Sequence, residues 1–294
     1  MANDRPRILV TGANGQLGSE LRAIAAPYSH YEFIFADRAI LSLSDPASIN
    51  HFFAGNTIDY CINCAAYTAV DKAETEKEAA FAINGDGPGY LATACKEQGA
   101  ALIHISTDYV FDGTATTPYL ETDPTCPIGA YGTSKLKGEE AVLNNNPNAI
   151  VIRTSWVYSF FGNNFVKTML RLMKERESLN VVNDQLGSPT YAADLASAIM
   201  QIITQWNRQP LPANRIFNYS NSGIISWHDF ARAIKEISGS KCSVHPIPGS
   251  QYPTPAKRPA YSVLDTQKIR QAFGIRIPEW KESLKTCLQL LLNS

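Results

Sequence analysis

Tyr131 and Lys135 are the two side chains of this sequence best suited to acid–base chemistry. They lie four residues apart in Ala130–Glu139, so on a helix they share one face and lie one turn apart. A free tyrosine titrates at about pH 10, and an ammonium group held beside it lowers that pKa. The pair would then act as acid and base in reducing a carbonyl or oxidising an alcohol. Among 13 tyrosines, chance alone supplies roughly one such spacing, so the pair needs support from elsewhere in the chain.

A glycine-rich turn near the N-terminus supplies that support. The apolar run Arg7–Thr11 is followed at once by Gly12, Gly15 and Gly18, and the helix formers of Gln16–Ala26 come next. Strand, glycine turn and helix form the context of a dinucleotide-binding motif. The glycines let the backbone approach a pyrophosphate, and the helix N-terminus supplies N–H donors. The alternative is an ordinary glycine-rich turn between a strand and a helix.

Asp37 strengthens the dinucleotide interpretation. It ends a second predicted strand, Phe33–Ala36, about 20 residues past the glycines, where an acidic side chain holds an adenosine ribose. Arg38 follows it and would attract a 2′-phosphate. The sequence therefore predicts a nicotinamide cofactor, NADPH or NADH, with both accepted at the ribose site.

Strands and helices alternate along the first part of the chain, which indicates an α/β fold with a doubly wound, Rossmann-like parallel sheet. The predicted strands are Arg7–Thr11, Phe33–Ala36, Ile58–Ala65, Ala101–Ser106, Ala149–Thr154 and Asn180–Val182. The predicted helices are Gln16–Ala26, Pro46–Ala54, Glu74–Gln98, Ala130–Leu143 and Asn164–Glu175. We expect an NAD(P)-binding domain over residues 1–183 and a smaller substrate-binding α/β subdomain over residues 184–294, with parts interleaved.

Further polar side chains follow the carboxyl ends of the predicted strands, where ligands of such sheets bind. Thr68 follows the third strand, and Ser106 and Thr107 end the fourth. The hydroxyls of Ser106 and Thr107 would reach a substrate oxygen beside Tyr131, or they make ordinary strand-end hydrogen bonds. Trp156, after the fifth strand, would form the wall of a sugar or base pocket, although tryptophan is more often a core residue.

The alternation weakens from about Asp184. We expect a loop, a helix, a short strand, a helix with Ser226 as N-cap and a proline-rich segment, at Gln185–Thr190, Ala192–Trp206, Arg215–Tyr219, Ser226–Ile237 and Ile247–Pro259. Long irregular segments are usually functional or disordered. We expect the proline-rich segment to be a substrate-binding loop in which Arg258 grips phosphate. The alternative is that Lys257 and Arg258 are an ordinary solvated basic pair.

Composition excludes other classes of function. With 294 residues, a net charge of −1 and a pI near 6.5, the chain offers no electrostatic case for binding nucleic acid or a membrane. It has no run of about 20 apolar residues that would span a membrane. Cys61 and Cys64 form a C-x-x-C inside an apolar run, so we expect core cysteines rather than a redox or metal site. No signal peptide precedes the first strand, and we expect a cytoplasmic protein.

Several longer blocks carry a family resemblance. TGANGQLG, STDYVF and YGTSK resemble the extended short-chain dehydrogenase/reductases. AAYTAVDKAE, RTSWVY, NDQLGSPT and YPTPAKRPAYS are similar, within that superfamily, to the dTDP-4-dehydrorhamnose reductases. The resemblance implies NAD(P)H-dependent reduction of the C4 keto group of a dTDP-sugar, dTDP-4-dehydrorhamnose, to dTDP-L-rhamnose. That nucleotide sugar is used for cell-surface polysaccharide.

The resemblance also implies roles for individual residues. Tyr131 would donate a proton to the C4 oxygen, Lys135 would hold the nicotinamide ribose and tune Tyr131, and Thr107 would complete the catalytic triad. The implied cofactor-binding residues are Gly12, Gly15, Gln16, Leu17, Gly18, Asp37, Arg38, Ala66, Tyr67, Thr68, Tyr131 and Lys135. The implied substrate-binding residues are Thr68, Val70, Thr107, Asp108, Tyr109, Trp156 and Arg258, the last at the pyrophosphate.

The chain departs from one part of the family pattern. Some members are described as joining subunits through Mg²⁺ held by acidic residues after the PT motif and near the C-terminus. Here alanine occupies position 193, and Gln289–Ser294 has no carboxylate side chain. We therefore expect no metal site, no requirement for Mg²⁺, and a monomer or weak homodimer.

Two alternatives to this enzyme stay open. One is a non-catalytic, NADP-binding regulatory subunit of the same subfamily, as for methionine adenosyltransferase. The other is a different sugar-nucleotide reductase or epimerase with the same core. The presence of Thr107, Tyr131 and Lys135 together favours an enzyme.

Overall fold

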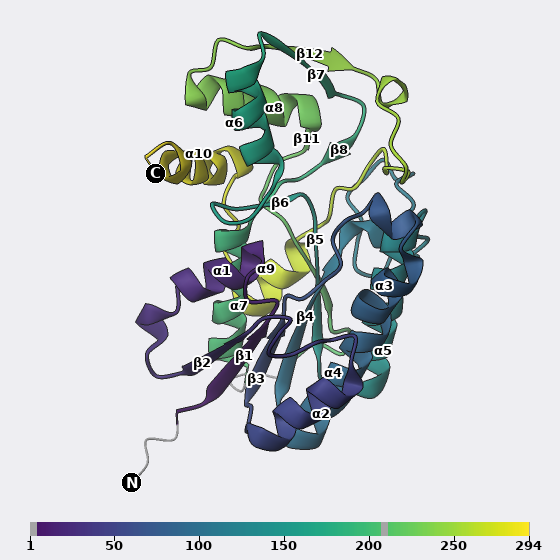
Figure 1. The fold of residues 1–294 in the computed structure, drawn as a ribbon, viewed down its shortest axis with the longest axis vertical. Helices are drawn as coiled ribbons and strands as arrows, with labels where there is room; N and C mark the ends of the chain where they lie inside the picture. The colour runs from purple at the N-terminus through teal and green to yellow at the C-terminus, as the bar shows by residue number, and fades with distance from the viewer. Residues whose placement is uncertain (1–4, 207–210, 294) are drawn as a thin grey trace.

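The structure, a computed structural model, describes residues 5–206 and 211–293. Its centre is a six-stranded sheet in which every neighbouring pair is parallel, in the order β10-β5-β4-β3-β1-β2 (Figure 1). The strands are β1 (Arg7–Thr11), β2 (Glu32–Ala36), β3 (Tyr60–Asn63), β4 (Ala101–Thr107), β5 (Ile150–Thr154) and β10 (Ile216–Tyr219). The predicted doubly wound, Rossmann-like sheet is confirmed.

Helices cover both faces of this sheet, because its strands are apolar on both sides. On one face lie α1 (Gln16–Ala23), α7 (Ala192–Gln205) and α9 (Gln267–Phe273), and on the other lie α2 (Pro46–Gly55), α4 (Gly87–Gln98) and α5 (Ala130–Asn145). Alternation along β1 explains the two layers. Ile8 and Val10 pack in the cluster with α1 and α7, whereas Leu9 packs with α2 and α4.

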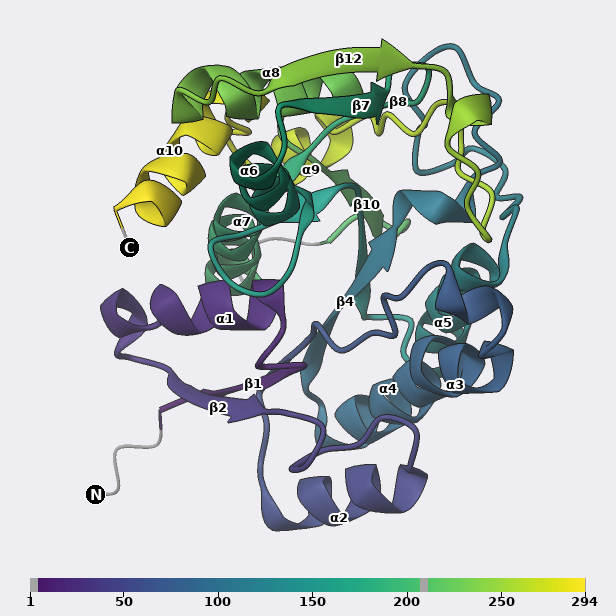
Figure 2. The ribbon, with the colours of Figure 1, turned by 45° about the horizontal axis from the view of Figure 1, so that its top comes forward.

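A smaller α/β unit lies beyond the upper end of the sheet (Figures 1 and 2). It contains α6 (Phe165–Glu175), α8 (Trp227–Ser238) and α10 (Trp280–Leu292), with the parallel pair β7 (Ser178–Val182) and β12 (Ser243–Ile247). Two short pairs join it to the sheet: β6 (Val157–Tyr158) with β9 (Thr190–Tyr191), and β8 (Leu186–Gly187) with β11 (Ile225–Ser226). Its core includes Val166, Phe230 and Leu284, all fully buried.

Two sequence predictions of secondary structure need correction. The strand predicted at Asn180–Val182 pairs with β12 outside the main sheet, and β10 is the sixth strand of that sheet. The single helix predicted at Glu74–Gln98 is broken into α3 (Lys77–Phe81), a π-helical turn (Ala82–Asp86) and α4. Pro88 accounts for the break. It has no N–H to donate to the backbone carbonyl of Asn84, four residues earlier, and its ring crowds that carbonyl.

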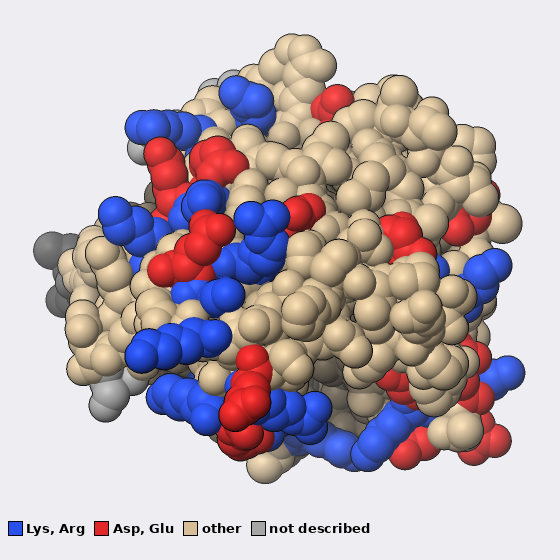
Figure 3. All heavy atoms as spheres, turned by 90° about the horizontal axis from the view of Figure 1, so that it is seen from above, with Lys and Arg blue, Asp and Glu red and all other residues tan. Residues whose placement is uncertain are grey.

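Other parts of the C-terminal third also differ from expectation. The predicted loop Gln185–Thr190 contains the short strand β8, and β9 begins at its last residue. The sequence patterns predict none of α9, α10 and β12. Within the described residues, no helix has the length and apolar character needed to cross a membrane. On the face drawn in Figure 3, acidic and basic side chains are intermixed rather than segregated.

The N-terminus of α8 is closed by the capping residue that the sequence predicts. The Ser226 hydroxyl accepts a hydrogen bond from Asp229 N at 3.1 Å, and the Asp229 carboxylate accepts one from Ser226 N at 3.1 Å. This capping box satisfies two backbone donors that the helix itself cannot. It also fixes the start of α8, and therefore the position of Trp227, the first residue of the helix.

We expect Ser226→Ala to lower the free energy of unfolding by about 1 kcal/mol, because a buried N-cap bond is lost. Urea denaturation followed by circular dichroism measures this change. Ser238→Ala removes a hydroxyl at the other end of α8 and is the control, with an expected change below about 0.5 kcal/mol. Equal losses in the two variants would contradict the capping account.

Candidate active site

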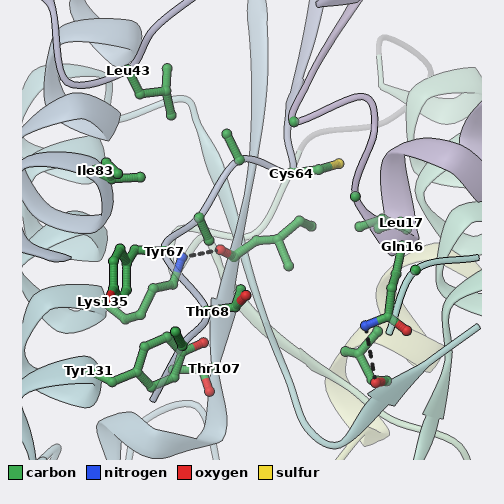
Figure 4. A pocket seen from close by; sticks show the side chains of 18 of the residues that line it. Gln16, Leu17, Leu43, Cys64, Tyr67, Thr68, Ile83, Thr107, Tyr131 and Lys135 are labelled. Carbon is green, nitrogen blue, oxygen red and sulfur yellow. Dashed lines mark hydrogen bonds between the residues drawn. The ribbon is translucent and has the colours of Figure 1, made fainter. Parts of the chain in front are cut away.

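A cavity of about 1280 Å³ lies at the carboxyl ends of β1, β3 and β4. The strand order reverses between β1 and β3, and ligands of doubly wound sheets bind at such a point. All the predicted site residues line this cavity except Gly18 and Arg258. Figure 4 shows side chains from α5 and from the glycine turn approaching it from opposite sides.

The glycine turn exposes its backbone to the cavity. Gly12 has φ 62°, and a Cβ there would lie 2.6 Å from Ala65 N. Gly15 is the N-cap of α1 and has no side chain to occupy the helix N–H groups. Gly18 lies behind the turn, where a Cβ would lie 2.6 Å from Gly12 O, so its role is to let α1 pack against the turn. The resulting arrangement presents amide donors and a helix N-terminus to an anion.

Asp37 and Arg38 line the far end of the same cavity. One carboxylate oxygen of Asp37 accepts hydrogen bonds from Ala39 N at 2.9 Å and Ile40 N at 3.2 Å. The other accepts one from Asn14 Nδ2 at 3.0 Å. These bonds hold the carboxylate at the end of β2, whereas Arg38 is exposed.

Lys135 is held between α5 and the sheet. Its Nζ donates a hydrogen bond to Ile105 O at 2.6 Å, and the side chain is buried (Figure 4). Burial lowers the pKa of Lys135 to about 8, and the carboxylate of Glu139 acts against this shift. Lys135 is therefore protonated below about pH 8 and neutral above it.

Tyr131 lies one turn earlier on α5, beside Thr107 at the end of β4. Burial raises the pKa of Tyr131 to about 12, and a hydrogen bond with Thr107 acts against this shift. The predicted lowering of this pKa by Lys135 is wrong for this structure, because the lysine is bound to Ile105 O and burial dominates. At neutral pH Tyr131 therefore carries a proton that it can donate.

Ser106 and Thr107 have different surroundings, because neighbouring residues of a strand point to opposite faces. The Ser106 hydroxyl donates a hydrogen bond to Glu139 Oε1 at 2.5 Å, and Arg153 forms a buried ion pair with the same carboxylate at 2.7 Å. The expected contact of Ser106 with a substrate oxygen is therefore not available to its hydroxyl. Thr107 keeps its place beside Tyr131.

Asp108, next to Thr107, is a buried acid on the cavity wall. Burial raises its pKa to about 6, and hydrogen bonds with Ser262 and Thr107 act against this shift. One of its carboxylate oxygens has no hydrogen-bond partner among the described residues. Buried polar atoms are almost always paired, so this oxygen is suited to bind a hydroxyl group of a ligand.

Arg258 does not line the cavity. Its guanidinium donates to Asp71 Oδ2 at 2.8 Å and to Ala256 O at 3.1 Å, and Ala256 N donates to Asp71 Oδ1 at 3.1 Å. These bonds tie the proline-rich segment to the loop that follows β3. Binding of phosphate by Arg258 stays a prediction. Of the alternative solvated pair, Lys257 is exposed, whereas Arg258 is bonded to Asp71 and Ala256.

Asn84 is a site residue that the sequence analysis misses. It is fully buried in the π-helical turn, where its Oδ1 accepts from Tyr67 N at 2.8 Å and its Nδ2 donates to Tyr67 O at 3.0 Å. The same Nδ2 donates to Ser134 Oγ on α5 at 3.1 Å. Asn84 thus joins the loop after β3 to the helix of Tyr131. Pro88, four residues later, is the sequence signal that marks it.

Other parts of the cavity wall were also not predicted. Cys61 is buried as expected, but Cys64 follows the last residue of β3 and lines the cavity. Leu43, Ile83 and the segment 162–164 line it too. Asn164 caps α6 and donates to Gln16 Oε1 at 3.1 Å, so it connects the smaller unit to the glycine turn.

The described residues contain no group of three or more His, Cys, Asp or Glu side chains placed to hold a metal ion. Asp194, the acid nearest position 193, accepts hydrogen bonds from Asn221 Nδ2 at 2.7 Å and Ser283 Oγ at 2.5 Å. Its carboxylate thus joins α7 to α10. The expectation that Mg²⁺ is not required stays a prediction.

Comparisons with known proteins decide the family. The model described as "RmlD substrate binding domain" matches residues 6–293. A dTDP-4-dehydrorhamnose reductase of Sinorhizobium fredii is 45% identical, covering 97% of this chain and 98% of its own. The chain belongs to the dTDP-4-dehydrorhamnose reductase family. The family resemblance found in the sequence blocks is thereby confirmed.

Solved structures of this reductase family share the fold. One, from Clostridium acetobutylicum, is 42% identical with a TM-score of 0.92 and covers 97% of this chain and 99% of its own. Another, from Bacillus anthracis and in complex with NADP, is 38% identical with the same TM-score and the same coverage. The likeness extends over both the main sheet and the smaller unit.

We expect Asp71→Asn to expose the proline-rich segment to trypsin. The bond after Lys257 is the site to follow, since Lys257 is exposed and proline at 259 protects the bond after Arg258. Loss of a partly exposed ion pair should raise the cleavage rate about 2- to 5-fold. Asp86→Asn breaks an ion pair between the π-helical turn and Lys137 of α5 and should leave cleavage at Lys257 unchanged. An unchanged rate in Asp71→Asn would show that this ion pair does not restrain the segment.

Proposed function

We propose that this protein reduces the C4 keto group of dTDP-4-dehydrorhamnose to dTDP-L-rhamnose, with NADPH or NADH as the hydride donor. One observation carries the proposal: Thr107, Tyr131 and Lys135 line the same cavity as the Gly12–Gly15 turn. A proton donor and a dinucleotide-binding turn are what such a reduction needs together. Two relatives, 45% and 41% identical to this chain, are named dTDP-4-dehydrorhamnose reductase, and their names support this choice of substrate.

The residues present fit a nicotinamide dinucleotide. The amides of Gly15, Gln16 and Leu17 would hold the pyrophosphate at the N-terminus of α1, where Gly12 leaves room for the backbone to approach. Asp37 and Arg38 would hold the adenosine ribose, and Ala66, Tyr67 and Thr68 would lie along the cofactor. When bound, the reduced cofactor supplies the hydride.

The side chains of this chain manage the proton. Tyr131 is protonated at neutral pH, since its pKa is about 12, and it would pass that proton to the oxygen of the ketone. Thr107 would hold the same oxygen through its hydroxyl. Lys135 would donate hydrogen bonds to the hydroxyls of the nicotinamide ribose.

The substrate would occupy the part of the cavity nearest the smaller unit. Trp156 would form its wall, Asp108 would accept a hydrogen bond from a sugar hydroxyl, and Val70 and Tyr109 would contact the sugar nucleotide. For Arg258 we propose that the arriving pyrophosphate competes with Asp71 for the guanidinium.

We also propose a two-part organisation of the chain. Residues 1–183 form the NAD(P)-binding part and residues 184–294 the substrate-binding part, with interleaving. Two placements support the interleaving: α6 and β7 pack in the smaller unit, and β10 completes the main sheet.

We propose a cytoplasmic enzyme that is a monomer or a weak homodimer.

The test is to follow absorbance of the reduced nicotinamide in the presence of the purified protein. We expect NADPH to be consumed only when dTDP-4-dehydrorhamnose is added, with dTDP-L-rhamnose as the product. Binding of NADP without turnover of any dTDP-keto-sugar would favour the regulatory-subunit alternative. Turnover of a different sugar nucleotide alone would favour another reductase or epimerase.

Tyr131→Phe should lower kcat by about 10²- to 10⁴-fold, because the ring is kept and the proton is removed. The dissociation constant for NADPH should change little, and both values come from steady-state kinetics and fluorescence titration. Tyr90→Phe, on α4 and 46% exposed, is the matched control and should behave as wild type. Near-normal turnover in Tyr131→Phe would remove this residue from the mechanism.

The enzyme should accept both cofactors, with kcat/KM values within roughly 100-fold, or about 2.7 kcal/mol. Asp37 favours the free 2′-hydroxyl of NADH and repels a 2′-phosphate, whereas Arg38 attracts that phosphate. Arg38→Ala should weaken NADPH alone, and Asp37→Ala should weaken NADH. The two effects are measured with each cofactor varied in turn. A larger preference in the wild type, or an Arg38→Ala variant that treats both cofactors as before, would show that this balance is misjudged.

A further inference from the structure

Trp156 has a backbone conformation that bulky residues avoid. Its φ is 48°, and among the described residues it is the one non-glycine with positive φ. Such strain persists where the surrounding structure fixes it, and it concentrates at functional sites. Here Trp156 O accepts a hydrogen bond from Thr190 N at 3.3 Å, and the preceding Ser155 Oγ donates to Ser188 O at 2.7 Å. Hydrogen bonds to residues 188 and 190 thus hold the turn at Ser155 and Trp156, after the end of β5.

The indole of Trp156 is clamped by two residues of the smaller unit. Its ring stacks on that of Trp227, with centroids 3.6 Å apart and planes 10° from parallel. At Gly187 a Cβ would lie 2.6–2.8 Å from the indole atoms Cε2, Cζ2 and Nε1. The backbone of Gly187 is not among the positive-φ glycines. Space for the indole, rather than backbone conformation, is therefore what glycine provides at this position.

Trp227 is itself held firmly. It is the first residue of α8, whose capping box fixes the start of the helix. The Phe165 ring of α6 lies 4.7 Å from its ring. Gly187 belongs to β8, which pairs with β11 directly before Trp227. Both sides of the clamp therefore belong to one packed unit, while Trp156 follows β5 of the main sheet.

Trp156 lines the cavity together with Thr107 and Tyr131. Contacts with the smaller unit thus fix the position of the Trp156 ring. The proton donor, Tyr131, is positioned by α5. We propose that Gly187 and Trp227 are positioning residues, which fix the indole of Trp156 so that the sugar ring is presented to Tyr131. This inference rests on the proposed function, since it names what sets the substrate's orientation.

The stack gives a signature that does not depend on activity. Two parallel indoles at this separation couple their electronic transitions, so the ligand-free wild type should show an exciton-coupled band in the circular dichroism of its tryptophans. Trp227→Phe keeps an aromatic ring at the start of α8 and should abolish this band. Trp206→Phe, at the end of α7, should keep it. A wild type without the band would overturn the clamp.

Kinetics separate positioning from mere structure. Gly187→Ala should lower kcat/KM for the sugar nucleotide about 10-fold or more, because a misplaced wall disturbs the reactive geometry. The dissociation constant for NADPH should stay within about 2-fold, since the glycine turn lies elsewhere. The control is Gly55→Ala, where a Cβ meets nothing within 4 Å, and it should match wild type.

Trp227→Phe keeps the inference testable if Gly187→Ala does not fold. We expect it to raise KM for the sugar nucleotide about 3- to 10-fold, the loss typical of an aromatic stack. If the exciton band is lost while KM and kcat stay at wild-type values, the clamp is structural only and the inference fails while the proposed function stands. A wild type that turns over no keto-sugar would overturn both.

Discussion

The structure of the site depends on the hydrogen bond from Lys135 Nζ to the carbonyl of Ile105. This bond joins α5 to β4 in a buried place, so the helix cannot slide along the sheet without leaving an ammonium group unpaired. The buried Glu139–Arg153 ion pair reinforces the same contact from β5. Because the position of α5 is fixed, Tyr131 lies at the end of β4, beside Thr107.

Burial acts on the two titratable groups of α5 in opposite directions. It raises the pKa of Tyr131 and lowers that of Lys135, because it disfavours the charged form of each. Tyrosine thereby keeps a proton to donate, and the lysine is charged only up to about pH 8. Glu139 keeps Lys135 from losing its charge sooner. The same packing that fixes the geometry therefore also sets the protonation states.

The sequence predicts what depends on local pattern. The glycine turn, the strands that surround it and the four-residue spacing of Tyr131 and Lys135 are all of this kind. It does not predict which face of β4 Ser106 takes, since a shift of one residue reverses the faces. Nor does it predict the pair Arg258–Asp71, whose members are 187 residues apart. Asn84 was missed for the same reason, because its partners lie on a loop and on another helix.

The most direct test of this account is the affinity for NADPH between pH 7 and 9.5, measured by fluorescence titration. This range lies above the second pKa of a phosphate, about 6, so the cofactor's own charge is constant. The account predicts that wild-type affinity falls about 3- to 10-fold as pH rises through the Lys135 pKa of about 8. In Lys135→Met, affinity should be weak and independent of pH. A wild-type affinity that stays flat across this range, or a step that persists in Lys135→Met, would contradict the role of the buried lysine.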